Sequence, residues 1–109
     1  PGLDLSVGAL TARTAKIRDV RFAVPQSLIG KDTASSIQAG VYYTHVGGLD
    51  WMIRHYRDLL GPDTAVVLTG GAMSVLCRDL RPSQPLFTDP LLVERGLIQV
   101  LSPLLEEHP

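Results

Sequence analysis

The chain has 109 residues, with 10 basic and 11 acidic side chains, so its formal net charge is −1. This length allows one small domain and excludes a two-domain enzyme with a complete cleft of its own. The near-zero charge gives no electrostatic reason to expect nucleic acid or an anionic membrane as a partner, and no apolar run reaches the roughly 20 residues that span a bilayer. Cys77 is the only cysteine, which excludes an intrachain disulfide and favours a reducing, cytoplasmic setting.

The first predicted elements are a short helix and an extended segment. Leu3, Val7 and Leu10 keep helical spacing, which predicts a helix over about residues 4–14. Residues 20–25 alternate apolar and polar side chains and end at a proline, which is typical of an edge strand or an extended loop. The chain opens directly on the helical pattern without an initiator methionine, so we interpret it as a piece of a longer protein.

A long helical pattern then runs from about residue 34 to residue 60. Gly40, Gly47 and Gly48 lie on the side opposite its apolar stripe, although each glycine in a helix interior costs roughly 1 kcal/mol against alanine. They indicate a kink near Gly47, or a face that another backbone approaches closely. The aromatic side chains of this helix are expected to be core or dimer contacts: Tyr42, Tyr43, Trp51 and Tyr56.

The second half of the chain predicts two strands and two helices. Residues 65–68 are continuously apolar, as in a strand that is covered on both faces, and a helix over about 72–80 follows. After a short strand over 86–88, Asp89 as N-cap and a proline at the first helical position predict a last helix over about 91–105. Its side chains expected to point inward are Leu92, Leu97, Val100, Leu101 and Leu104.

The turn between the first strand and its helix is the strongest local signal for ligand binding. At Thr69, Gly70 and Gly71 a strand ends in two glycines and a helix begins at once, which leaves free backbone N–H groups at a helix N-terminus. Glycine also lets a ligand approach the backbone without a Cβ in the way. No lysine follows as in a Walker A loop, and no G-x-G-x-x-G fingerprint is present. A tight structural turn is the alternative interpretation.

Thr33, directly before the long helix, is the second candidate. Its hydroxyl can bind a polar substrate, or it can serve, like Asp32, only as a helix cap. The other polar residues form no catalytic cluster, and Asp50 and Asp58 are expected to form ion pairs on a solvated helix face that also carries two arginines, Arg54 and Arg57. The three histidines lack metal-ligand spacing: His45, His55 and His108.

Six segments in register resemble the C-terminal half of type III pantothenate kinases. In chain order they are Pro1-Gly2, Arg13-Thr-Ala-Lys16, Ile29-Gly-Lys-Asp-Thr33, Gly40-Val-Tyr-Tyr, Val67-Leu-Thr-Gly-Gly71, and Asp89-Pro90 with Gly96-Leu97. The resemblance implies an α/β fold, namely a ribonuclease H-like C-terminal domain of an actin-like ATPase fold (the superfamily of acetate and sugar kinases, Hsp70 and actin). This domain would be helix-rich and incomplete in residues 1–109. The chain departs from the family pattern at Asp32, where asparagine is commoner, at Ile17-Arg18 and at Thr44.

The same resemblance implies a function for the whole protein. Such kinases phosphorylate pantothenate to 4′-phosphopantothenate with ATP, in the first step of coenzyme A biosynthesis, using Mg²⁺ and a monovalent cation, K⁺ or NH₄⁺. They work as homodimers. Thr33 matches the family's substrate-contacting threonine, and Thr69, Gly70 and Gly71 match the motif that faces the adenosine side of the nucleotide.

The resemblance also implies what this chain lacks. The phosphate loop, the catalytic aspartate and the aspartate for the monovalent cation belong to the other half of the family, so no catalytic residue and no metal ligand is expected here. The isolated fragment is therefore expected to be inactive. The alternative is a non-catalytic regulatory or dimerisation paralogue of the same fold.

Overall fold

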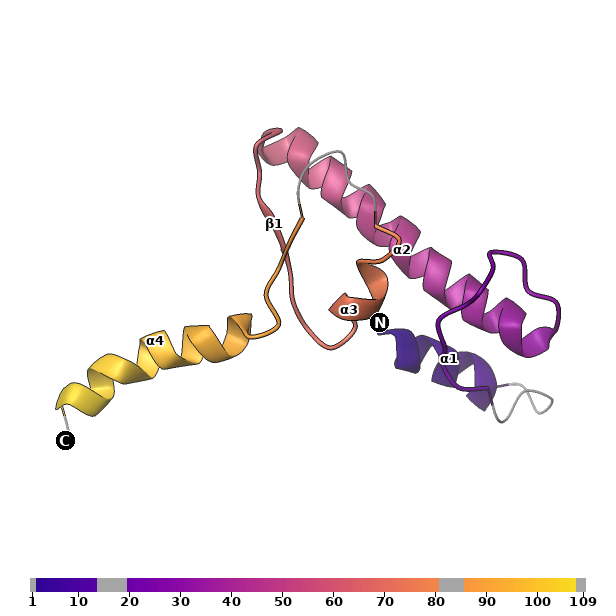
Figure 1. Cartoon of the computed structure of the whole chain (residues 1–109), viewed down its shortest axis with the longest axis horizontal. Coiled ribbons are helices and arrows are strands. Elements are labelled where there is room, and N and C mark those ends of the chain that lie inside the picture. The colour runs from indigo at the N-terminus through magenta and orange to yellow at the C-terminus, as the bar shows by residue number, and fades with distance from the viewer. Residues whose placement is uncertain (1, 14–19, 81–85, 108–109) are drawn as a thin grey trace.

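The computed structural model describes residues 2–13, 20–80 and 86–107, and these form four helices and two short strands (Figure 1). In chain order the elements are α1 (Leu3–Ala12), α2 (Thr33–Leu60), β1 (Val66–Leu68), α3 (Met73–Leu76), β2 (Leu86–Thr88) and α4 (Leu92–Glu107). This part of the chain is helix-rich with a small parallel sheet. Three features of the sequence lie outside the described residues: Pro1, the segment 14–19 and His108.

The core lies where α1 and α3 pack against α2. Its buried members are Leu3, Val7, Val41, Tyr42, Val46, Leu76 and Leu80. Val20, Phe22 and Val24 are half-buried against this cluster. The alternating pattern of residues 20–25 therefore belongs to an extended segment that turns every second side chain to the core, and not to a strand.

Helix α2 confirms the long helical pattern, and it runs unbroken through Gly47. Helix α1 is shorter than expected, and Leu10 is exposed although Leu3 and Val7 are buried. Helix α3 is a single turn rather than the helix expected over residues 72–80, and Leu76 and Leu80 are buried. The spacing of α1 therefore predicts the burial of Leu3 and Val7 correctly but not that of Leu10, and both short helices end earlier than predicted.

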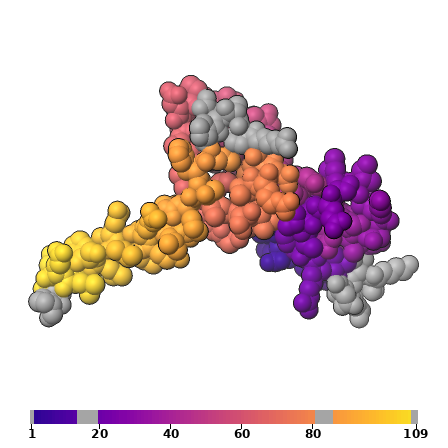
Figure 2. Space-filling model, viewed as in Figure 1, coloured from indigo at the N-terminus to yellow at the C-terminus, as the bar shows by residue number. Residues whose placement is uncertain are grey.

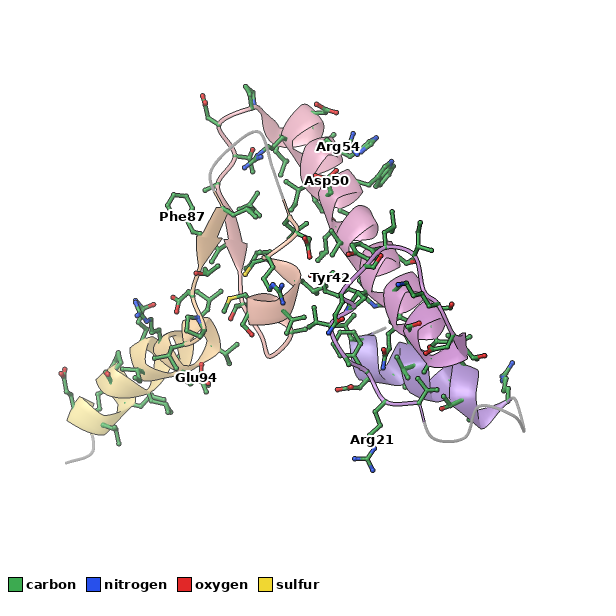
Figure 3. All side chains as sticks on the ribbon, turned by 45° about the vertical axis from the view of Figure 1, so that its right-hand side comes forward. Arg21, Tyr42, Asp50, Arg54, Phe87 and Glu94 are labelled. Carbon is green, nitrogen blue, oxygen red and sulfur yellow. The ribbon has the colours of Figure 1, made fainter. Side chains whose placement is uncertain are left out.

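The two strands pair in parallel, with Val66 opposite Leu86 and Leu68 opposite Thr88. A parallel pair needs a crossover connection, and α3 lies within it. The expectation of a strand covered on both faces is wrong for this chain, because the middle pair, Val67 and Phe87, is 46% and 56% exposed. Figure 3 shows Phe87 on the open side of the sheet. An apolar run shows that both faces are suited to burial, but the cover has to come from other segments.

Helix α4 stands away from the rest of the molecule (Figures 1 and 2). The expectation that its apolar face points inward is wrong in this structure. The five side chains concerned, Leu92, Leu97, Val100, Leu101 and Leu104, are between 43% and 66% exposed. The amphipathic pattern is correct for the helix, but no other described segment covers its apolar side.

The described chain is therefore extended. Its radius of gyration is 18.4 Å, whereas about 13 Å is typical of a compact domain of this length. Among the helices of the described ranges, none combines the length and the apolar character that a membrane crossing requires. The arrangement leaves the sheet and α4 with apolar surface that a compact α/β domain buries.

Candidate functional site

The start of α2 is fixed by Asp32. The Asp32 carboxylate accepts a hydrogen bond from the backbone N–H of Ser35 at 2.7 Å, and the Ser35 hydroxyl accepts one from the Asp32 N–H at 3.1 Å, which is a capping box. The hydrogen bonds from the Ser35 backbone and side chain hold the pKa of Asp32 below its usual value. Thr33 is the first helical residue, so the interpretation of Thr33 as the cap is wrong.

Gly30 also has a structural task in this motif. A Cβ on Gly30 would lie 2.5 Å from backbone atoms of Ser36, so only glycine fits without a shift of the chain. In contrast, the Thr33 side chain is exposed, and its hydroxyl makes no hydrogen bond to any residue of the described part. Thr33 therefore has a polar group that the local fold does not use.

An open depression of about 570 Å³ lies beside this helix start. It is lined by residues 23–27 and by polar side chains of Lys31, Asp32 and Ser35. Thr33 is not one of its lining residues. The depression and the Thr33 hydroxyl are thus neighbouring but separate features of the same end of α2.

The turn after β1 is built around Gly70. Its φ of +95° is a backbone conformation that favours glycine, and its carbonyl accepts a hydrogen bond from the Met73 N–H at 3.2 Å. Gly71 has no positive φ, and a Cβ placed on it would meet no described atom within 4 Å. A helix begins after the turn as expected, but α3 has only four residues instead of spanning residues 72–80, so its N-terminus has a smaller dipole than that of a long helix. The open backbone of the turn is what remains for a ligand.

Asp89 lies next to this turn because the strands are parallel. The Asp89 N–H donates to the Leu68 carbonyl at 3.0 Å, which extends the strand pairing to the residues that precede Thr69. The carboxylate accepts from the Leu91 N–H at 3.0 Å and lies 3.7 Å from Arg95. Asp89 therefore closes the turn before α4, but the expected place of Asp89 as N-cap is wrong, because the helix begins only at Leu92. Sequence reasoning gave Asp89 only this capping role. The signal that it missed is that carboxyl ends of parallel strands meet at one edge, where α/β proteins bind ligands.

The two candidate regions are not brought together within the described chain. Thr69, Gly70 and Gly71 form one turn, whereas the start of α2 lies at a different part of the molecule (Figure 1). The core under α2 and α3 separates them. A single site can use both regions only if its two ligands together are long enough to span the distance between them. Otherwise, residues outside the described chain have to complete the site.

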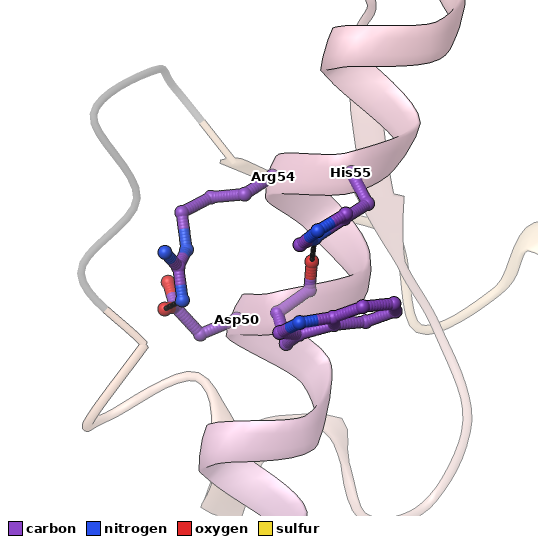
Figure 4. A network of polar contacts seen from close by, with 4 residues as sticks. Asp50, Arg54 and His55 are labelled. Atoms are coloured by element: carbon purple, nitrogen blue, oxygen red, sulfur yellow. Dashed lines mark hydrogen bonds and ion pairs between the residues drawn. The ribbon is translucent and has the colours of Figure 1, made fainter.

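The remaining polar residues of α2 serve the helix itself. Asp50 and Arg54 form an ion pair at 3.1 Å, as expected from their spacing (Figure 4). Nδ1 of His55 donates to the Trp51 carbonyl at 2.8 Å. Arg57 is only 7% exposed and its Nε donates to the Thr64 carbonyl at 3.4 Å, so its expected place on a solvated face is wrong. Over the described ranges, no three histidine, cysteine or acidic side chains gather as a metal site would require.

The chain is similar to type III pantothenate kinases. The family model described as type III pantothenate kinase matches residues 1–55. The type III pantothenate kinase of Salinispora arenicola is 36% identical over 91 residues, which are 81% of this chain and 36% of that protein. Those of Syntrophus aciditrophicus and Bacillus cytotoxicus are 34% and 30% identical over 97 residues, with 37% and 36% of their length covered. The chain therefore spans little more than a third of these relatives.

Proposed function

Because the chain belongs to the type III pantothenate kinase family, we propose that it forms the C-terminal part of an ATP-dependent kinase that converts pantothenate to 4′-phosphopantothenate. The fold proposed for the whole protein is an actin-like ATPase, of which residues 1–109 form a helix-rich part of the ribonuclease H-like C-terminal domain. The observation that carries the proposal is the parallel pairing of β1 and β2, which sets the Thr69–Gly71 turn at the carboxyl edge of a sheet.

Each candidate residue has a proposed role at this edge or at the start of α2. The turn at Thr69, Gly70 and Gly71 forms a wall for the adenosine side of ATP, because its open backbone lets a flat, polar ligand edge approach. The Thr33 hydroxyl binds a polar group of pantothenate. This role is supported by Asp32, which caps α2 and leaves the threonine without a structural task.

The chemical groups of phosphoryl transfer are not assigned to this chain. Mg²⁺ supplies charge neutralisation at the phosphates in such reactions, and a base or positioning group orients the attacking hydroxyl. The described residues do not fit a metal ion, because no cluster of ligand side chains exists among them. We therefore assign no ligand for Mg²⁺ or for the monovalent cation, and no catalytic base. The contribution proposed for this chain is binding and orientation.

A homodimer is also proposed, with α2 at its interface. Gly40, Gly47 and Gly48 are exposed on α2, and a Cβ on any of them would meet no described atom within 4 Å. An apolar groove of about 780 Å³ between α1 and α2 lies along the same side. Small residues let two helices approach closely, so a second copy is the proposed cover. The alternative cover is another part of the same polypeptide.

The test uses the full-length protein that contains this chain. We expect ADP release that depends on pantothenate. This reaction would be the first step of coenzyme A biosynthesis, and the enzyme is proposed to be cytoplasmic. The 109-residue chain alone is expected to show no turnover. A full-length protein that folds and dimerises but does not phosphorylate pantothenate would favour the alternative, a non-catalytic regulatory or dimerisation paralogue.

A further inference from the structure

The most completely buried aromatic side chain, Tyr42, makes a polar contact between two helices. Its relative exposure is 0%, and its hydroxyl donates toward the Asp79 carboxylate at 2.6 Å and the Val75 carbonyl at 3.1 Å. A phenol has one proton, so the two acceptors share it, and the shorter contact to the carboxylate is of the stronger, charge-assisted kind. Figure 3 shows Tyr42 between α2 and α3.

Both acceptors belong to the segment that directly follows the Thr69–Gly71 turn. Val75 lies in α3, and Asp79 follows α3 by about one turn. The segment has its own hydrogen bonds, from the Met73 N–H to the Gly70 carbonyl at 3.2 Å and from the Cys77 N–H to the Met73 carbonyl at 3.0 Å. A side chain that fixes the positions of Val75 and Asp79 therefore also restricts the Thr69–Gly71 turn, because the hydrogen-bonded segment between them is short.

On the other side, Tyr42 is joined to Thr33 by unbroken helix. They are nine positions apart, which corresponds to about 14 Å along α2. Contacts with two aromatic rings also fix the position of the Tyr42 ring. Its centroid lies 6.4 Å from that of Phe22, in a stacked arrangement, and 5.1 Å from that of Tyr43, in an edge-on arrangement. The hydroxyl of Tyr42 is thus a rigidly placed donor.

We propose that Tyr42 is a positioning residue that holds the Thr69–Gly71 turn in register with Thr33, through the hydrogen bonds of its hydroxyl to Asp79 and Val75. The inference rests on the proposed function, in which the turn and Thr33 contact the two substrates. Burial, followed by the hydrogen bond to Asp79, raises the pKa of Tyr42 to about 12. The hydroxyl therefore keeps its proton, and stays a donor, throughout the neutral pH range.

The chain offers a matched pair of variants for the test. Tyr42→Phe keeps the ring and removes the link, whereas Tyr43→Phe removes the neighbouring hydroxyl, which makes no hydrogen bond within the described part. In the full-length kinase, Tyr42→Phe is expected to raise the KM for ATP about 3- to 10-fold and to leave the KM for pantothenate within about twofold. Tyr43→Phe is expected to change neither. Asp79→Asn, which keeps an acceptor oxygen, is expected to behave more like the unsubstituted protein than Asp79→Ala.

Amide hydrogen exchange gives a readout that does not need activity. In Tyr42→Phe, the amides of residues 73–77 are expected to exchange at least several-fold faster than in the unsubstituted protein, whereas exchange in the middle of α2 is unchanged. If Tyr42→Phe folds poorly, Asp79→Ala is expected to give the same result. Unchanged exchange at 73–77, or equal loosening of the whole chain, would overturn the inference, as would equal rises in both KM values. If the unsubstituted protein does not phosphorylate pantothenate, the proposed function fails, and the exchange data alone decide whether Tyr42 holds this segment.

Discussion

Gly30 lies so close to Ser36 that a Cβ on residue 30 would be 2.5 Å from the Ser36 backbone. The extended backbone before α2 is therefore pressed against the first turn of the helix. This contact and the capping box of Asp32 and Ser35 give a structural role to most of the segment Ile29-Gly-Lys-Asp-Thr33. What the fold does not account for is the exposed hydroxyl of Thr33.

The close approach at Gly30 gives the first prediction. Gly30→Ala is expected to destabilise the full-length protein by about 1–3 kcal/mol, because the added methyl group must displace the backbone of Ser36. Gly8→Ala is the control. Gly8 lies inside α1 with open space around its Cβ, so alanine should stabilise by about 0.5–1 kcal/mol. Thermal melting of both variants measures the effect, and equal melting temperatures would contradict the contact.

The second prediction concerns pH. Hydrogen bonds from Ser35 lower the pKa of Asp32 in the folded state, so the ionised cap stabilises the protein above the unfolded pKa of about 3.8. This contribution is lost as the pH falls through the lower, folded value. Asp32→Ala is expected to reduce the melting temperature at pH 7, and the difference should shrink below about pH 4. Asp32→Asn keeps a capping oxygen, so it should retain most of the stability at pH 7 without the acid-dependent loss.

The third prediction separates Thr33 from its neighbour. Thr33→Ala in the full-length protein is expected to weaken pantothenate binding about 2- to 13-fold, with ATP binding unchanged. This is the effect of losing one hydrogen bond of about 0.5–1.5 kcal/mol. The melting temperature should not change, because Asp32 caps the helix. Thr33→Ser retains the hydroxyl and serves as the control. A lower melting temperature with unchanged pantothenate affinity would assign Thr33 to folding only.

Local patterns predict local structure well in this chain. Helix α2 begins within one residue of its predicted start, and Asp89 closes the turn before α4, although not as the N-cap of that helix. These features depend on a few consecutive residues.

What the sequence could not predict depends on contacts between distant segments. The apolar stripe of α4 and the run of β1 show which surfaces are suited to burial, but not which segment covers them, and here they stay exposed. The proximity of Asp89 to Thr69 follows from the parallel pairing of β1 with β2, which neither strand encodes alone. Tyr42 was expected only as a core or dimer contact, because its partner Asp79 is 37 residues away.

The fourth prediction uses the two glycines of the turn as a matched pair. Gly71→Ala is tolerated by the chain, since its Cβ meets open space and its φ is not positive. A loss of ATP affinity in this variant, with normal melting and normal pantothenate affinity, is expected if the nucleotide lies against the turn. Gly70→Ala strains a φ of +95° and should lower the melting temperature as well. If Gly71→Ala binds ATP normally, the turn has only a structural role.

The last prediction tests the exposed glycine face of α2. Gly47→Glu introduces a charge where the described chain leaves open space, so the variant should fold normally as a single copy. If α2 of a second copy packs against this face, the buried charge should convert a full-length dimer to a monomer in sedimentation, because an unpaired charge at an interface is strongly unfavourable. Pantothenate phosphorylation should fall as well, because Thr33, the proposed pantothenate contact, begins the same helix.

Gly8→Glu on α1 is the control for the added charge, since Gly8 is also exposed with open space around it. It should leave the dimer and the activity intact. An active, dimeric Gly47→Glu variant would move the interface away from this face of α2. A protein that is monomeric without substitution, and that Gly47→Glu destabilises, would instead show that another part of the same polypeptide covers the glycines.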